Sequence, residues 1–338
     1  MTDLELPRVP GVTRVGTAAA WVSGISCLPY LALKVLWTVG VPLGISDESV
    51  LGDIGWVLSN ALMAVVQLLA VALVVALARP WSRRLPPWLL LFPAWVGTGV
   101  LFQVMIGSAV GAALSGTSQD PSSSDDPIRP WVYVLVYVAF ALQGTALAVV
   151  FAAHVRARWG RLFTMRTSEV VDHGRKDRVS SWSGRNLVQI TVAVASMALG
   201  TAIVFSSWSG AGAFALSGTD TERSVPMQVA RATGAAVAAL GMFALAGRWG
   251  ARLRFWWPAA LVWVGSGALV VFDGLSFLLN GLFVRAGAEA ASDATWELTD
   301  TVLAAKVLVG VLAAAVGVLA LSAAAAGHAS AQAEPAQK

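Results

Sequence analysis

The sequence predicts an all-α integral membrane protein, a bundle of eight transmembrane helices built as two tandem four-helix repeats (4+4). Three observations lead to this prediction. Of the 338 residues, 57% are hydrophobic and only 12% are charged, about half the charged fraction of a soluble domain. Eight apolar runs are long enough to span a bilayer, which takes about 20 residues. A distinctive motif also occurs twice at a constant spacing.

The eight apolar runs are separated by short turns or by polar loops, as expected for helices that cross the membrane in alternating directions. They lie at about 17–40, 55–78, 87–113, 131–153, 187–207, 227–246, 256–283 and 299–323.

The repeated motif is a cationic turn that contains tryptophan and leads into a glycine pair. The first copy spans 81–99 and the second spans 249–267, with an offset of 168 residues and no gap. We interpret the two copies as the trace of an internal duplication. The predicted domains are a first four-helix repeat at 1–160, a basic cytoplasmic linker at 161–186, a second repeat at 187–323 and a disordered tail at 324–338.

The distribution of basic residues predicts the orientation of the chain. Seventeen of the 23 Lys and Arg residues lie on one side of the predicted helices and three on the other. Because positive charge is retained in the cytoplasm, both termini are expected there, in the plasma membrane of a bacterial cell. Four helices return each repeat to its starting side, so the repeats are expected to be parallel rather than inverted. The net charge is +4, and the basic residues lie mainly on the short segments between apolar helices. This distribution does not indicate nucleic-acid binding.

The duplicated turns place arginine and tryptophan where helices meet the cytoplasmic headgroups. Tryptophan rings reside at that level and arginine binds phosphate. The motif is therefore interpreted as a lipid anchor, and the alternative is a specific lipid site at each copy. The anchor residues are Trp81, Arg84, Trp88, Trp249, Arg252 and Trp256.

Ionisable residues inside the predicted spans are the most informative about function, because they are costly in hydrocarbon and usually face a bundle interior or cavity. All five fall in the outer third of their helices. They are Lys34, Arg231, Asp273, Asp300 and Lys306.

Two of these ionisable residues, Lys34 and Asp273, belong to rows of polar residues that run along one face of their helices. Ser23, Ser26, Tyr30, Lys34 and Thr38 follow one another at spacings of three and four residues, which lines one helical face. A second stripe contains Ser266, Asp273, Ser276 and Asn280. These stripes predict a polar vestibule between the repeats that opens to the outside.

Lys34 and Asp273 have matching depths and are expected to pair, with Lys306 as the rival partner of Asp273. In the alternative prediction, the side chains of Lys34, Arg231 and Lys306 extend to the outer headgroups. Asp273 then pairs with one of these three cations. The predicted ligand-binding residues are Lys34, Asp273, Tyr30, Gln103, Asn280 and Lys306.

The sequence gives no indication of a metal or a cofactor. The three histidines, His154, His173 and His328, lie at no ligand spacing, and Cys27 is the only cysteine. Glycines at positions 99, 107 and 111 give the third helix a smooth face. Such a face permits close packing against a neighbouring helix, a protein partner or a second copy.

The string from Cys27 to Gly40 contains the pattern P-Y-x3-K-x2-W-x2-G. This pattern resembles one found in polytopic membrane proteins of high-GC bacteria that have no assigned function. The resemblance implies a membrane protein and supplies no catalytic residues, but it draws attention to Tyr30, Lys34 and Trp37.

The leading functional prediction is a protein that binds or transports a small solute or lipid entering from the outer face. The first alternative is a structural or regulatory membrane subunit without catalytic activity. The second is an intramembrane enzyme that uses Asp273 as acid or base, which is the weakest prediction because one carboxylate without a metal or nucleophile is a sparse constellation.

Overall fold

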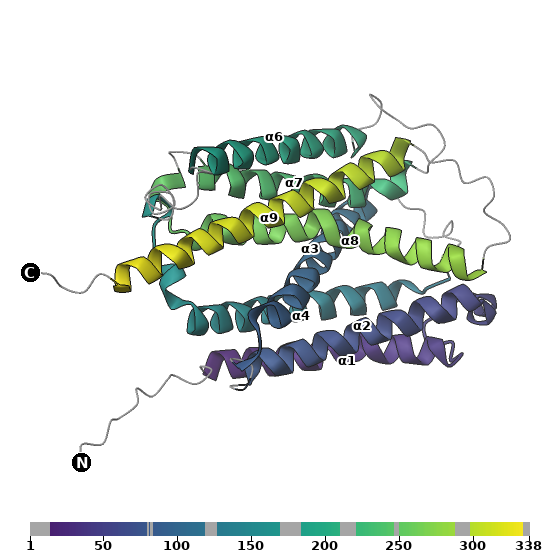
Figure 1. Cartoon of the computed structure of the whole chain (residues 1–338). Helices are drawn as coiled ribbons and strands as arrows, with labels where there is room; N and C mark the ends of the chain where they lie inside the picture. Colours follow the sequence, from purple (N-terminus) through teal and green to yellow (C-terminus); the bar gives the residue numbers. More distant parts are fainter. Residues whose placement is uncertain are drawn as a thin grey trace, which may run out of the picture. The chain divides into compact units, whose positions relative to one another are not determined.

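The computed structural model describes residues 14–79, 81, 84–118, 127–169, 184–209, 221–246, 250–287 and 298–333, and it leaves the side chains at several helix ends undescribed. In these residues the secondary structure is helical, with two isolated β-bridges and no β-strand. The long helices are α1 (Arg14–Thr38), α2 (Ile54–Ala78), α3 (Pro87–Ser118), α4 (Pro130–Arg158), α6 (Gly184–Ser209), α7 (Thr221–Ala246), α8 (Trp256–Gly287) and α9 (Leu298–Ala333) (Figure 1). Short 3-10 helices are η1 (Glu48–Gly52), η3 (Gly160–Phe163) and η4 (Gly250–Arg252).

Seven of these helices, α1 to α4, α6, α7 and α9, are long and apolar enough to cross a membrane. The described apolar part of α8, Trp256–Val271, is shorter. The chain is therefore a multi-pass helical membrane protein by the length and composition of its helices.

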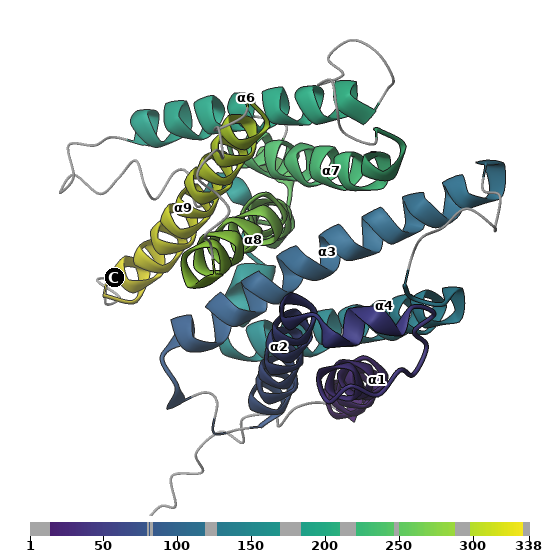
Figure 2. The same cartoon turned by 90° about the vertical axis from the view of Figure 1, so that its right-hand side faces the viewer.

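The chain forms two compact units. The first unit comprises Met1–Ala94 and Gln119–Gly160, and so contains α1, α2, α4 and the start of α3. Helix α1 packs against both α2 and α4, and α2 also contacts α4 (Figure 2). A compact apolar cluster lies at the end of α1 where the chain turns toward α2. Its fully buried members are Leu33, Trp37, Ile45 and Val132.

A structured loop covers this cluster. Gly40 and Gly44 have φ angles of 84° and 76°, a region in which residues with a side chain are strained. Ile45 then pairs with Ile128 in an isolated antiparallel bridge. Asp53 caps α2 by accepting a hydrogen bond of 2.7 Å from the Trp56 amide.

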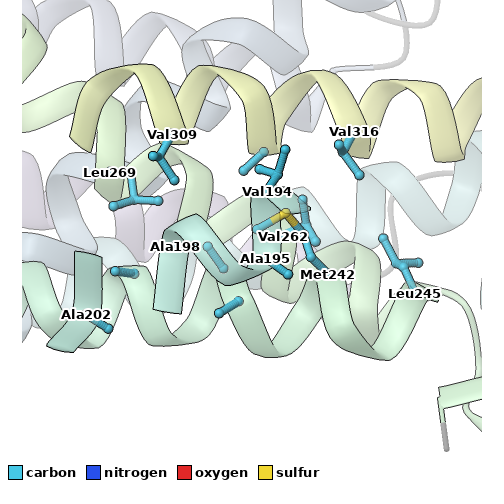
Figure 3. Packing of buried hydrophobic residues seen from close by; sticks show 14 of the residues in the cluster. Val194, Ala195, Ala198, Ala202, Met242, Leu245, Val262, Leu269, Val309 and Val316 are labelled. Atoms are coloured by element: carbon cyan, nitrogen blue, oxygen red, sulfur yellow. The ribbon is translucent and has the colours of Figure 1, made fainter. Parts of the chain in front are cut away.

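The second unit comprises Trp95–Ser118 and Arg161–Lys338. Helix α6 packs on α7, α7 on α8, α8 on α9, and α9 again on α6, which closes a four-helix arrangement (Figure 2). Its core is rich in alanine and valine, with Ala195 and Ala198 of α6 facing Met242 of α7 and Val262 of α8 (Figure 3). Small side chains allow these helices to approach closely, as is usual in membrane bundles.

The remainder of α3 belongs to this second unit, which differs from the predicted domain bounds of 1–160 and 187–323. The reason is a close contact of α3 with α8. A methyl group added at Gly99 would lie 2.6 Å from the carbonyl carbon of Gly267. Glycine at both positions lets the two backbones touch.

The helix ends lie close to the predicted bounds at α2 and at the start of α8, and differ most at α9. This helix continues to Ala333, into the segment 324–338 that was expected to be a disordered tail. Its last turns are rich in alanine, the strongest helix former, which explains the extension.

Candidate functional site

Lys34 lies in α1 of the first unit and is half-buried. Its Nζ donates a hydrogen bond of 2.8 Å to Oδ1 of Asn60, a fully buried residue of α2. The amide nitrogen of Asn60 donates in turn to the Trp56 carbonyl at 2.8 Å. Because the nitrogen is committed to the backbone, the Asn60 oxygen is held toward Lys34.

Two aromatic rings flank the same ammonium group. Lys34 Nζ lies 5.1 Å from the ring centroid of Tyr30 and 4.8 Å from that of Trp37, within the range of cation–π contacts. Tyr30 and Trp37 precede and follow Lys34 by about one helical turn, which places the three side chains on one face. The indole of Trp37 donates to the Leu43 carbonyl at 2.8 Å, so the covering loop fixes its ring.

The hydrogen-bonding groups of this cluster include more donors than acceptors. A lysine ammonium has three donors, and within the described residues Asn60 supplies its only acceptor. The buried Nε1 of Trp56, whose ring centroid lies 5.8 Å from that of Trp37, has no acceptor among the described residues. Every contact of Lys34 in the described part of the chain is to a neutral group. A cation with neutral neighbours and a spare N–H nearby is chemically suited to an anion.

Two other members of the α1 stripe bond within the helix itself, whereas the Ser23 hydroxyl donates to the Gln143 carbonyl of α4 at 3.5 Å. Ser26 donates to the Ser23 carbonyl at 3.0 Å, and Thr38 donates to the Lys34 carbonyl at 2.7 Å. Because these hydroxyls bond to the preceding turn, they add little polar surface. Of the residues in the predicted stripe, Lys34 and Tyr30 therefore remain as candidates for ligand binding.

A second polar contact is buried in the same unit. Gln67 of α2 donates to Gln143 of α4 at 3.0 Å between the side-chain amides. Both side chains are buried. They form a pair that joins two helices, not a surface that faces an open space.

Gln103 is fully buried in the second unit, with 0% of its surface exposed. Its amide nitrogen donates to the Ala268 carbonyl at 2.7 Å, and Trp95 donates to the Ser266 hydroxyl at 3.0 Å. The Gln103 Oε1 has no donor among the described residues. Gln103 thus takes part in packing α3 against α8, which differs from the expected role of lining a vestibule.

Lys306 of α9 is also buried, with 1% of its surface exposed, so it does not extend to the headgroups. Its Nζ lies 5.8 Å from the ring centroid of Phe205 in α6. The guanidinium of Arg231 in α7 lies 5.7 Å from the same centroid and donates to Gln228 at 3.3 Å. Two cations from different helices therefore share one buried phenyl ring.

Several predicted residues cannot be placed. The side chains of Asp273, Asn280 and Asp300 lie outside the described part of the structure, as does Trp249. The pairing of Lys34 with Asp273 and the vestibule between the repeats therefore stay predictions.

Four of the described members of the predicted lipid anchors are exposed. Trp81, Arg84 and Arg252 are exposed, and Trp88 exposes 66% of its surface. Trp256 is half-buried and stacks on Trp257 with centroids 4.2 Å apart. Such exposure is compatible with contact to headgroups.

Asn60 and Trp56 were not singled out in the sequence, although they complete the Lys34 cluster. One signal was present, because Asn60 is a lone amide in the outer part of an otherwise apolar run. Within the described residues, no three His, Cys, Asp or Glu side chains lie close enough to hold a metal ion. Comparison with protein families, curated proteins and solved structures finds no match to the chain.

Proposed function

We propose that this membrane protein binds or transports a small solute or lipid that carries an anionic group, a carboxylate or a phosphate, at Lys34. The ammonium group would bind the anion, the Trp56 indole would supply a second hydrogen bond, and Tyr30 and Trp37 would contact the adjoining apolar part. The site would lie in the outer leaflet of the bacterial plasma membrane, with both termini in the cytoplasm.

The observation that carries this proposal is the neutral environment of Lys34. A lysine inside a membrane-spanning helix is costly unless its charge is compensated. Asn60 and two aromatic rings compensate it in part. An anionic ligand would complete the compensation and use the donor of Trp56.

We further propose that the chain contains two parallel four-helix repeats, with α1 to α4 corresponding to α6 to α9. The packing of the first helix in each half supports this proposal. Helix α1 packs on α2 and α4, as α6 packs on α7 and α9. Gly99 and Gly267, which touch, are separated by the offset of the two sequence motifs. A direct contact between corresponding residues is typical of elements related by a two-fold axis.

The glycines of α3 are relevant to the alternative prediction of a structural or regulatory subunit, in which they would pack against a protein partner. Gly99 packs on Gly267, and the nearest atoms to methyl groups added at Gly107 and Gly111 belong to Pro226 of α7, at 3.7 and 3.8 Å. The contact with Gly267 therefore accounts for Gly99, whereas methyl groups at Gly107 and Gly111 would make only ordinary contacts within the chain.

The test compares the full-length protein with Lys34→Gln by native mass spectrometry after purification in a mild detergent. We expect an anionic molecule to accompany the native protein and to be reduced about tenfold or more in Lys34→Gln, because a charge-assisted hydrogen bond is lost. Arg129→Gln, which removes an exposed cation beside the covering loop, should retain the molecule.

The variant Asp273→Asn distinguishes two explanations for the charge of Lys34: neutralisation by a bound anion, or neutralisation by Asp273 of the same chain. If the proposal is correct, this variant keeps both the bound molecule and the stability of the native protein. If Asp273 neutralises Lys34, Asp273→Asn and Lys34→Gln each lower the melting temperature and the double variant restores it. That second pattern, without a copurified anion, would overturn the proposal.

A further inference from the structure

The cytoplasmic linker is attached to the second basic turn by a short antiparallel pairing within the second unit. The Phe255 amide donates to the Met165 carbonyl at 2.9 Å, and the Thr167 amide donates to the Leu253 carbonyl at 3.0 Å. The buried Thr167 hydroxyl reinforces this contact by donating to the same carbonyl at 3.2 Å. The linker segment is therefore held against the turn by three hydrogen bonds.

This pairing sets Arg166 directly opposite Arg254. The hydrogen bonds are made by the residues on either side, so the two arginines form a non-hydrogen-bonded pair. In such a pair the Cα atoms are about 4.5 Å apart and the side chains share one face. Like charges placed opposite each other in this way are unfavourable, so an anion between them would relieve a repulsion that the backbone imposes.

The described surroundings of the pair contain further positive charge. Arg252 lies two residues before Arg254, and all three arginines are exposed. No carboxylate is paired with any of the three among the described residues. Glu169 is the one acidic residue in 160–169, and its amide donates to the Arg166 carbonyl.

Apolar side chains border the same patch. Leu253 exposes 37% and Trp257 exposes 53% of their surfaces, and Phe163 packs on Trp256 with centroids 5.7 Å apart. Helix α8 begins at Trp256, so its first turn lies where an apolar span meets the headgroup region. Arginine and tryptophan at that level contact phosphate and the glycerol region of lipids.

We propose that Arg166, Arg252 and Arg254 form a binding site for the phosphate of an anionic phospholipid in the cytoplasmic leaflet. The phosphate bridges Arg166 and Arg254, and Arg252 adds a third cation. The acyl chains extend along the exposed faces of Leu253 and Trp257. The site is independent of Lys34, which lies in the first unit.

The corresponding first basic turn is held by different hydrogen bonds. Arg84 and Leu85 stand 168 positions before Arg252 and Leu253. The Leu85 carbonyl accepts a hydrogen bond of 3.2 Å from the Arg158 guanidinium, whereas the Leu253 carbonyl accepts from the linker backbone and Thr167. In the described part of the first turn, Arg84 is exposed and no backbone bridge sets a second arginine opposite it.

The experiment measures lipids retained by the full-length protein in native mass spectrometry, after exchange into detergent with phosphatidylglycerol or phosphatidylcholine. An arginine near an anionic lipid surface contributes about fivefold in affinity, so Arg166→Gln with Arg254→Gln should lower phosphatidylglycerol retention about 25-fold. Arg252→Gln should lower it about fivefold. The variant Arg129→Gln, which removes an exposed cation that is not one of the predicted lipid anchors, should leave retention unchanged. Phosphatidylcholine should be retained equally by every variant.

A melting experiment in neutral detergent checks the same proposal through folding. Without anionic lipid, the double variant should melt at or above the temperature of the native protein, because a repulsion has been removed. Phosphatidylglycerol should raise the melting temperature of the native protein only. A double variant that unfolds or melts lower would overturn the proposal. So would equal losses in Arg129→Gln and Arg252→Gln, or stabilisation by inorganic phosphate that matches the effect of the lipid.

Discussion

The contact between α3 and α8 should be highly sensitive to a single methyl group. In Gly99→Ala, the added carbon would lie 2.6 Å from the Gly267 carbonyl carbon and 3.0 Å from Val271 Cγ2, whereas carbon atoms at optimal separation are about 3.5–4.0 Å apart. The nearest neighbour is backbone, so the helices must separate by about 1 Å. Overpacking of this kind costs about 1–3 kcal/mol. Separation also weakens the bond from Gln103 to the Ala268 carbonyl, worth about 1 kcal/mol.

A matched substitution isolates this effect from helix propensity. Alanine favours a helix over glycine by about 1 kcal/mol, which benefits Gly99→Ala and Gly107→Ala equally. At Gly107 the nearest atom to the added methyl is the Pro226 carbonyl oxygen, at 3.7 Å, an ordinary contact. Gly107→Ala should therefore be neutral or stabilised, and Gly99→Ala should be less stable than Gly107→Ala by about 2–4 kcal/mol.

The assay is reversible unfolding in mixed micelles, followed by tryptophan fluorescence. If Gly99→Ala unfolds at the same detergent composition as Gly107→Ala, the two backbones are not in contact and the assignment of α3 to the second unit fails.

Three further predictions concern the first unit. Gln67→Leu should destabilise the protein by about 1–3 kcal/mol by stranding the Gln143 amide, and the double leucine variant should recover part of the loss in the same unfolding assay. Gly44→Ala should cost more than Gly40→Ala, because both have positive φ but only the methyl at Gly44 meets other residues; equal melting temperatures would contradict this. The exposed Asp47 carboxyl accepts hydrogen bonds from the hydroxyl and the backbone amide of Ser49. These bonds hold the pKa of Asp47 below its ordinary value. Its small stabilising contribution should therefore be present at neutral pH and lost as the pH falls through that lowered pKa, so melting temperatures of Asp47→Asn and the native protein should converge in acid.

The helices were the most predictable part of the structure, for a simple physical reason. An apolar run must bury its backbone polar groups in internal hydrogen bonds, so length and hydropathy alone locate it. The run predicted at 55–78 is observed as Ile54–Ala78, with Asp53 as its cap. The apolar composition of a run does not show which helices will pack together, so the membership of α3 in the second unit was not anticipated.

The candidate site was predictable in part. Lys34 stood out as a charge in an apolar run, and the 3.6-residue period placed Tyr30 on its face. Its partner Asn60 depends on how α2 is rotated about its own axis, which a period within α1 does not determine. Gln103 illustrates the same limit, because a polar residue at membrane depth has two outcomes. It faces a cavity, or it bonds to a neighbouring backbone, as Gln103 does with Ala268.

The touching glycines at 99 and 267 have a consequence for the history of the chain under the proposed duplication. Before the fusion, a single four-helix ancestor would have met an identical copy of itself through this glycine. Any mutation there would have altered both sides of a homodimer at once, and only glycine would have been tolerated. Joining the copies in one gene released that constraint, because each side of the contact can now vary alone.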